Sequence, residues 1–328
     1  MSNLDRDPHP PEPVPAGGPG PQLLRPRDVP LGGPRAMTVR RTLPSRERTF
    51  IGAWCFVDHY GPDDVAETGG MVVAPHPHTG LATVSWLFTG EIEHRDSAGH
   101  HAMVRPGEVN LMTAGRGISH SEVSTPGTTV LHGAQLWVAL PEAARDTAPR
   151  FEHHAPDPVT GEGYEARVFL GSLLGVTSPV TTDSPLLGVE LLLEPGAAVE
   201  IEVDPAHEHG VLLDAGGLAV DDVVLAPGDL LALPPGAAVR RFVAGPAPVR
   251  ALLLGGPPFG EEIVMWWNFV GRTHDDVVAA REQWQAQLGP EGEGHLGLVD
   301  GRFGVPVGAD LPPVPAPALP GVRLRPRR

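Results

Sequence analysis

Two short histidine motifs constrain the fold of this chain more than any other feature. They are PHPH and SHSE, and each places two side chains of metal-binding type two positions apart. Because side chains on a β-strand repeat with a period of two, His76 and His78 share one face of a strand, and so do His120 and Glu122. Residues with this spacing do not face each other on a helix. The motifs therefore predict two neighbouring strands whose paired side chains close around one metal ion.

The residue types in these motifs define the chemistry of the predicted site. Three neutral imidazoles and one carboxylate suit a divalent first-row metal such as iron, copper, nickel or zinc. A His-x-His pair on a strand is by itself a weak signal, and a structural role competes evenly with a metal role. A His-x-Glu pair that follows the glycine-rich turn at 114–117 shifts the balance strongly toward a metal site. The competing interpretation of Glu122 is a surface carboxylate.

The rest of the chain supplies the β-structure that such a site needs. The 328 residues include 41 glycines and 39 prolines, which interrupt short apolar runs and are typical of an all-β protein with many turns. Good strand segments occur at 83–88, 108–113 and 118–122, and 129–140 forms one long strand or a strand pair. No long amphipathic helix separates these segments, so a sandwich or small barrel is expected.

Bulk properties exclude several classes of function. The formal net charge of −16 disfavours direct binding to nucleic acids and to anionic membranes. No run of about 18 apolar residues is present to span a membrane. The single cysteine, Cys55, lies in an apolar run and is expected to be a buried core residue, and no intramolecular disulfide can form. No early stretch resembles a signal peptide, so we expect a cytoplasmic protein.

The strand-and-turn rhythm occurs twice along the chain. The segment VRPGEVNLM in the first half has a counterpart, LAPGDLLAL, in the second half. The pair His207 and His209 repeats the His-x-His spacing, but no His-x-Glu follows it, so the second unit is expected to be free of metal. Residues 275–288 are the clearest helix, with an apolar face and with Thr273 or Asp275 as its N-cap.

Several other histidines lie outside the two motifs. His59 is expected to form hydrogen bonds in a loop, and His94, His100 and His101 are expected to be solvated residues that flank a turn. His132 is expected either to support a metal ligand by a hydrogen bond or to make a polar core contact, and Gln135 shares this ambiguity. Four apolar residues flank the proposed metal, where they form plain barrel core or an apolar substrate cavity: Trp86, Phe88, Met112 and Trp137.

The segment PHPHTGLATVSWLFTGEIEHRDSAG, followed by RPGEVNLMTAGRGISHSE, closely resembles the pirin family of bicupins. The later segment GPPFGEEIVMWWNFVGRT extends the resemblance, which covers about residues 25–290. It implies two tandem cupin barrels of the jelly-roll type with a short C-terminal helix. The expected division is a disordered segment at 1–25, a metal-binding cupin domain at 26–145, a metal-free cupin domain at 146–290 and a Gly/Pro-rich tail at 291–328.

The resemblance also implies a site and an activity. The four ligands in the family pattern are His76, His78, His120 and Glu122, and the usual metal is iron, as one Fe(II) ion. The implied activity is that of a quercetin 2,3-dioxygenase acting on a flavonol-like aromatic substrate, with Glu122 also as proton acceptor. Ala82 replaces a glutamate of the general cupin motif, and we expect this change to remove a carboxylate at the pocket mouth. The alternative is a non-enzymatic, redox-sensitive regulatory protein whose metal site controls binding of a protein partner.

Overall fold

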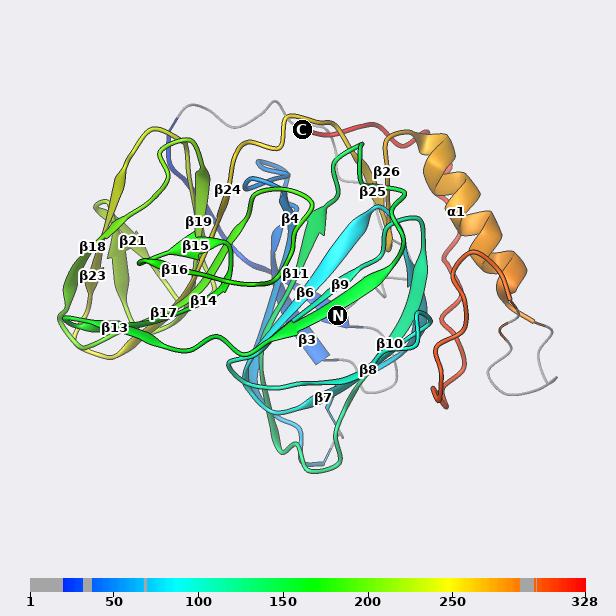
Figure 1. Cartoon of the computed structure of the whole chain (residues 1–328), viewed down its shortest axis with the longest axis horizontal. Coiled ribbons are helices and arrows are strands. Elements are labelled where there is room, and N and C mark those ends of the chain that lie inside the picture. The colour runs from blue at the N-terminus through cyan, green and yellow to red at the C-terminus, as the bar shows by residue number, and fades with distance from the viewer. Residues whose placement is uncertain (1–19, 32–36, 68–69, 290–297, 299) are drawn as a thin grey trace.

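The computed structural model describes residues 20–31, 37–67, 70–289, 298 and 300–328. Two β-barrels pack side by side, and one helix lies beyond the first barrel (Figure 1). The prediction of an all-β chain with two barrels and a short C-terminal helix is confirmed. Among the described residues, no helix is long and apolar enough to cross a membrane.

The first barrel consists of a larger and a smaller antiparallel sheet. The larger sheet contains, in spatial order, β12 (Arg150–His154), β9 (Val109–Thr113), β6 (Leu81–Thr89), β11 (Val130–Ala139), β4 (Trp54–Asp64), β3 (Met37–Leu43) and β2 (Arg27–Leu31). The smaller sheet contains β5 (Val72–His78), β10 (Ile118–Ser124), β7 (Ile92–Asp96) and β8 (His101–Val104). The segment 129–140 is thus one long strand rather than a strand pair.

The second barrel repeats this arrangement. Its larger sheet contains β1 (Gln22–Leu24), β22 (Leu230–Leu233), β19 (Glu208–Ala215), β24 (Val249–Gly256), β17 (Leu187–Leu193), β14 (Tyr164–Leu170) and β13 (Val159–Gly161). Its smaller sheet contains β18 (Ala198–Glu202), β23 (Val239–Ala244), β20 (Leu218–Val220) and β21 (Val223–Leu225). A two-stranded ribbon, β15 (Ser172–Leu173) with β16 (Val176–Thr177), lies beside it.

In each barrel, one edge strand of the larger sheet lies outside the residue range predicted for that domain. Strand β1 belongs to the segment expected to be disordered, yet it pairs with β22 of the second barrel. Strand β12 lies beyond the boundary expected near 145, yet it pairs with β9 of the first barrel. Backbone pairing to a partner distant in sequence overrides the weak local strand signal of these segments. Residues 1–19 of the first segment lie outside the described residues.

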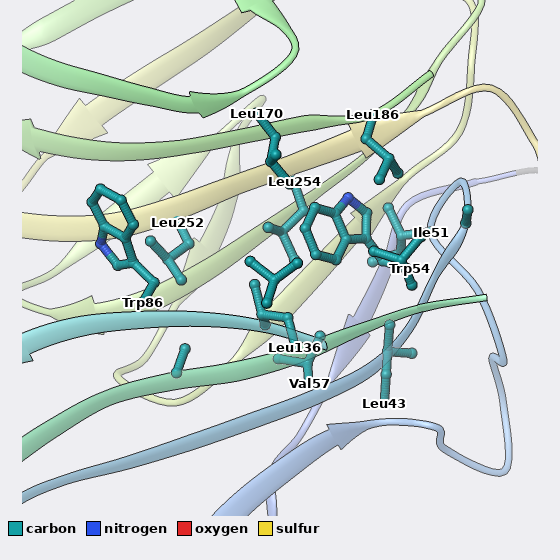
Figure 2. Packing of buried hydrophobic residues seen from close by; sticks show 14 of the residues in the cluster. Leu43, Ile51, Trp54, Val57, Trp86, Leu136, Leu170, Leu186, Leu252 and Leu254 are labelled. Atoms are coloured by element: carbon teal, nitrogen blue, oxygen red, sulfur yellow. The ribbon is translucent and has the colours of Figure 1, made fainter. Parts of the chain in front are cut away.

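The larger sheets of the two barrels pack face to face. Figure 2 shows this core, in which Trp86 and Leu136 of the first barrel lie near Leu252 and Leu254 of the second. The Trp86 ring stacks on Phe169 of β14 with centroids 4.5 Å apart. Burial of large apolar side chains from both sheets makes this interface a hydrophobic core, so the two barrels form one packed unit.

The C-terminal helix is fixed by its N-terminus and by its apolar face. Helix α1 (His274–Gln287) follows the short hairpin of β25 (Val264–Trp266) and β26 (Phe269–Gly271). Thr273 caps the helix in a capping box with Asp276, as one of the two predicted caps. Val277 and Trp284 are buried against the hairpin, together with Phe303 of the C-terminal segment.

Truncation of Trp86 tests the packing between the barrels. Because Trp86 is fully buried and stacks on Phe169, Trp86→Ala should lower the free energy of unfolding by about 3–5 kcal/mol. Denaturant unfolding followed by circular dichroism measures this change. Val224→Ala removes a side chain that is 72% exposed and serves as control, with an expected change within about 0.5 kcal/mol. Equal effects of the two substitutions would contradict a shared core.

Candidate metal centre

The pairing of three strands places the predicted ligands. Strand β10 lies between β5 and β7, and His120 is directly opposite His76 on β5 and Asp96 on β7. Glu122 is opposite His94 on β7. The side chains on the same face therefore point into the first barrel, as the spacing of two residues predicts.

A β-bulge changes the pairing beside Glu122. Between His120 and Glu122 the register with β5 shifts, so that Glu122 pairs with Val73 instead of Ala74. The extra residue lies on β5 next to Pro75, which cannot donate a backbone hydrogen bond to the ladder. The bulge separates Glu122 from the β5 histidines along the ladder, and the sequence spacing alone does not reveal this.

The three imidazoles converge through their Nε2 atoms. His78 Nε2 lies 3.1 Å from His76 Nε2 and 3.0 Å from His120 Nε2, and all three residues are fully buried. An ion about 2.1 Å from each donor holds neighbouring donors roughly 3 Å apart, so this spacing fits a bound cation. The Nδ1–H of His76 donates to the carbonyl of Ala74 at 2.8 Å, which leaves a lone pair on its Nε2.

Burial keeps these imidazoles in the form that binds metal. It lowers the pKa of His76 to about 4. Burial, followed by the neighbouring histidines, holds the pKa values of His78 and His120 well below their ordinary range. Neutral rings are metal ligands whereas protonated rings are not, so the cluster is ready for a cation at neutral pH.

Glu122 joins the cluster from the side of His120. A carboxylate oxygen of Glu122 and ring nitrogens of His94 and His120 lie within 4.8 Å of one another. Glu122 is 1% exposed, and its negative charge contributes to the raised pKa of Tyr60, whose main cause is burial. His120 therefore belongs to two overlapping groups, one with His76 and His78 and one with His94 and Glu122.

His94 and Asp96 support His120 on its Nδ1 side, opposite the converging Nε2 atom. Neither residue was predicted from the sequence to have this role. His94 Nδ1 lies 3.3 Å from His120 Nδ1, and its Nε2 lies 3.4 Å from Asp96 Oδ2. Asp96 also accepts from His100 Nδ1 at 3.0 Å. Such carboxylate–histidine chains orient a metal-binding imidazole and fix its tautomer. The prediction that His94 is a solvated turn residue is wrong, because it lies on β7 and is 3% exposed.

The spacing of His94 and Asp96 carried the missing signal. They are two positions apart, like the predicted ligands, and so share one face of β7. Burial raises the pKa of Asp96, but hydrogen bonds with His94 and with the backbone of His100 bring it below its ordinary value. The carboxylate is therefore ionised and available to accept from His94.

The four flanking apolar residues divide between two environments. The Trp137 ring meets His78 edge to face at 5.3 Å, and Met112 belongs to the same buried cluster as Trp137. Trp86 instead packs between the barrels, and Phe88 lies against His132 with ring centroids 4.9 Å apart. Trp137 thus forms apolar wall beside the imidazoles, with Met112 in the same cluster, whereas Trp86 and Phe88 lie elsewhere.

Ala82 does not lie at the mouth of the site, contrary to expectation. Its side chain belongs to the cluster between the barrels, together with Val84 and Trp86 of the same strand. Leu81, the preceding residue, faces the cluster that contains Trp137. Because successive side chains on a strand point to opposite faces, a side chain at position 82 faces the second barrel.

The C-terminal segment braces both histidine strands from outside. The backbone N–H of Val314 donates to the carbonyl of Pro75 at 2.8 Å. The hydroxyl of Ser119, which points away from the barrel interior, donates to the carbonyl of Gly304 at 3.1 Å. Residues next to His76 and His120 are therefore held by a segment that lies far along the chain, 185 positions beyond Ser119 in the case of Gly304.

The remaining histidines follow the predictions in part. His59 lies on strand β4 and is 1% exposed, so the expectation of a loop residue is wrong. His132 is on β11 as expected, but its hydrogen bond goes to Asp214 of the second barrel. Gln135 accepts from Ser85 in a buried polar contact. Neither His132 nor Gln135 has a described hydrogen bond to the converging imidazoles.

His94→Ala tests the supporting chain. Because it removes the group that orients His120, we expect metal affinity to fall by about 10–100-fold while the fold is retained. Competition with a fluorescent chelator measures the affinity. His101→Ala is the matched control, since His101 is exposed on the next strand and contacts Glu93. Unchanged affinity in His94→Ala would show that the chain has no role in metal binding.

Comparison with known proteins agrees with this architecture. Residues 36–138 match the Pirin family and residues 188–288 match the Pirin C-terminal cupin domain. A Pseudomonas aeruginosa protein provisionally named quercetin 2,3-dioxygenase is 43% identical over 90% of both chains, and a pirin-like protein of Caulobacter vibrioides is 37% identical over 76% of this chain and 88% of its own length. The crystal structure of a quercetin 2,3-dioxygenase from Acinetobacter baumannii superposes with a TM-score of 0.82 at 39% identity, covering 93% of this chain and 98% of that one. On both sequence and fold, the chain belongs to the pirin family of bicupins.

Proposed function

We propose that this chain is a metal-dependent dioxygenase of the quercetin 2,3-dioxygenase type, which acts on flavonol-like aromatic substrates with one Fe(II) ion. The observation that carries this proposal is the convergence of three neutral imidazoles inside the first barrel, with His78 Nε2 3.0–3.1 Å from the Nε2 atoms of the other two. The names of the Pseudomonas and Acinetobacter relatives support the same activity.

His76, His78, His120 and Glu122 would hold the ion in this proposal. Three imidazoles and one carboxylate would occupy part of the coordination shell of such an ion and would leave room for oxygen or substrate, as oxygen-activating iron sites require. When bound, the metal supplies the Lewis acidity and the redox chemistry of the reaction. The protein supplies the orientation of the ligands, through Ala74 for His76 and through His94 for His120.

Glu122 is the proposed proton acceptor for a flavonol hydroxyl. It adjoins His120, and a buried carboxylate near the metal is the group best placed to accept this proton. Trp137 and Met112 provide an apolar wall that suits a flat aromatic ring and limits the access of water.

Oxygen uptake tests the proposed activity. Protein loaded with Fe(II) under anaerobic conditions is mixed with a panel of flavonols and then with oxygen. Wild type should consume oxygen in step with loss of flavonol, and His120→Ala should lose most of both its iron and its uptake. Equal uptake by the two proteins, or none by either, would contradict a dioxygenase. Bound iron without turnover would instead favour the redox-sensitive regulatory role.

Glu122→Gln tests the role of the carboxylate in proton transfer. The amide keeps the size and an oxygen donor but accepts protons poorly, so kcat should fall by about 100-fold or more in a protein that still contains iron. Glu93→Gln, on the outer face of β7, is the control and should keep wild-type kcat. A wild-type rate in Glu122→Gln would assign the proton acceptor elsewhere.

A further inference from the structure

A second group of metal-binding side chains lies where the two barrels meet. His59 on β4 and His132 on β11 come from the first barrel, and Asp214 on β19 comes from the second. One ligand atom from each lies within 4.8 Å of the others, and all three residues are buried. Asp214 Oδ1 is 2.7 Å from His59 Nε2 and 2.6 Å from His132 Nε2.

Local irregularities in the strands aim two of these side chains. The pairing of β11 shifts register at His132 on both of its sides, toward β4 and toward β6. The pairing of β19 with β24 shifts between Leu213 and Ala215, which leaves Asp214 outside the regular ladder. Bulges of this kind redirect side chains and are enriched beside functional sites. The extra residues at His132 lie on the partner strands, one on β4 and one on β6. The chains approach closely here, because a Cβ at Gly133 would lie 2.7 Å from the carbonyl oxygen of Trp86.

The two carboxylate oxygens of Asp214 have different partners. Oδ1 faces the two histidines, and Oδ2 faces Arg250. Arg250 Nη1 lies 3.4 Å from Asp214 Oδ2, and its guanidinium also lies over the Phe88 ring at 4.9 Å. Glu190 balances the charge of Arg250, with its oxygen 3.5 Å from Arg250 Nε. The Arg250 side chain is 34% exposed and that of His132 is 9% exposed, so solvent lies nearest to the group on the side of Arg250.

We propose that His59, His132 and Asp214 form a second site, which binds a first-row divalent cation and bridges the two barrels. Two imidazoles and one carboxylate are a recognised donor set for such ions and leave further coordination positions for water. This site is separate from the converging imidazoles of the first barrel and does not depend on the proposed dioxygenase activity.

Binding of the cation requires only a small rearrangement. The ion replaces the two N–H donors that now meet Asp214 Oδ1, and the donor atoms must separate to roughly 3 Å around an ion at about 2.1 Å. Each neutral ring then carries its proton on Nδ1 instead of Nε2. The Nδ1 of His59 has no hydrogen-bond partner among the described residues, so moving the proton to it breaks no bond at that atom.

Zinc stoichiometry tests the second site. Chelator-treated protein is equilibrated with Zn²⁺, and bound metal is counted by mass spectrometry of the elements. Wild type should bind about two equivalents, His120→Ala and Asp214→Asn about one each, and the double variant almost none. Glu190→Gln, which removes a buried carboxylate beside the same arginine but no proposed ligand, should retain two.

Cobalt spectra in the His120→Ala background give a second measurement that does not depend on the folding of Asp214→Asn. Co²⁺ should give visible absorption bands in His120→Ala, and these bands should be lost when His132→Ala is added. The proposal would be overturned if wild type bound one equivalent of zinc and Asp214→Asn bound the same amount. It would also be overturned if Co²⁺ gave no visible bands in His120→Ala. The three residues would then be a metal-free hydrogen-bonded bridge between the barrels.

Discussion

The antiparallel pairing of β10 with both β5 and β7 is the constraint on which the candidate metal centre depends. It sets His120 opposite His76 on one side and opposite Asp96 on the other. Strand β10 thus holds His120 between β5, which carries His76 and His78, and β7, which carries Asp96. Enclosure within the barrel then buries the imidazoles, which keeps them neutral and able to bind a cation.

Much of this centre could be predicted from the sequence, because strand periodicity is a local property. The spacing within PHPH and SHSE was sufficient to place His76, His78 and His120 on one inner surface. The bulge on β5 was not predictable, since it depends on how two distant strands align. His94 was misassigned because its turn-rich surroundings outweighed its spacing of two from Asp96, which was the more informative signal.

The two barrels share a fold. The duplication was visible in repeated segments such as VRPGEVNLM and LAPGDLLAL, and both barrels have a larger and a smaller sheet. The packing of the two larger sheets was not visible, because each strand shows only that it has an apolar face. That packing determines the surroundings of Ala82 and brings Asp214 to His59 and His132, so these features emerge only from the tertiary structure.

The central claim is that His76, His78, His120 and Glu122 together hold one metal ion. Anomalous diffraction from crystals of iron-loaded protein, recorded on both sides of the iron absorption edge, tests it directly. The account predicts an iron peak about 2.1 Å from the Nε2 atoms of the three histidines, with a Glu122 oxygen completing the protein ligands. An iron peak elsewhere, or one at the histidines with Glu122 directed away from it, would contradict the account.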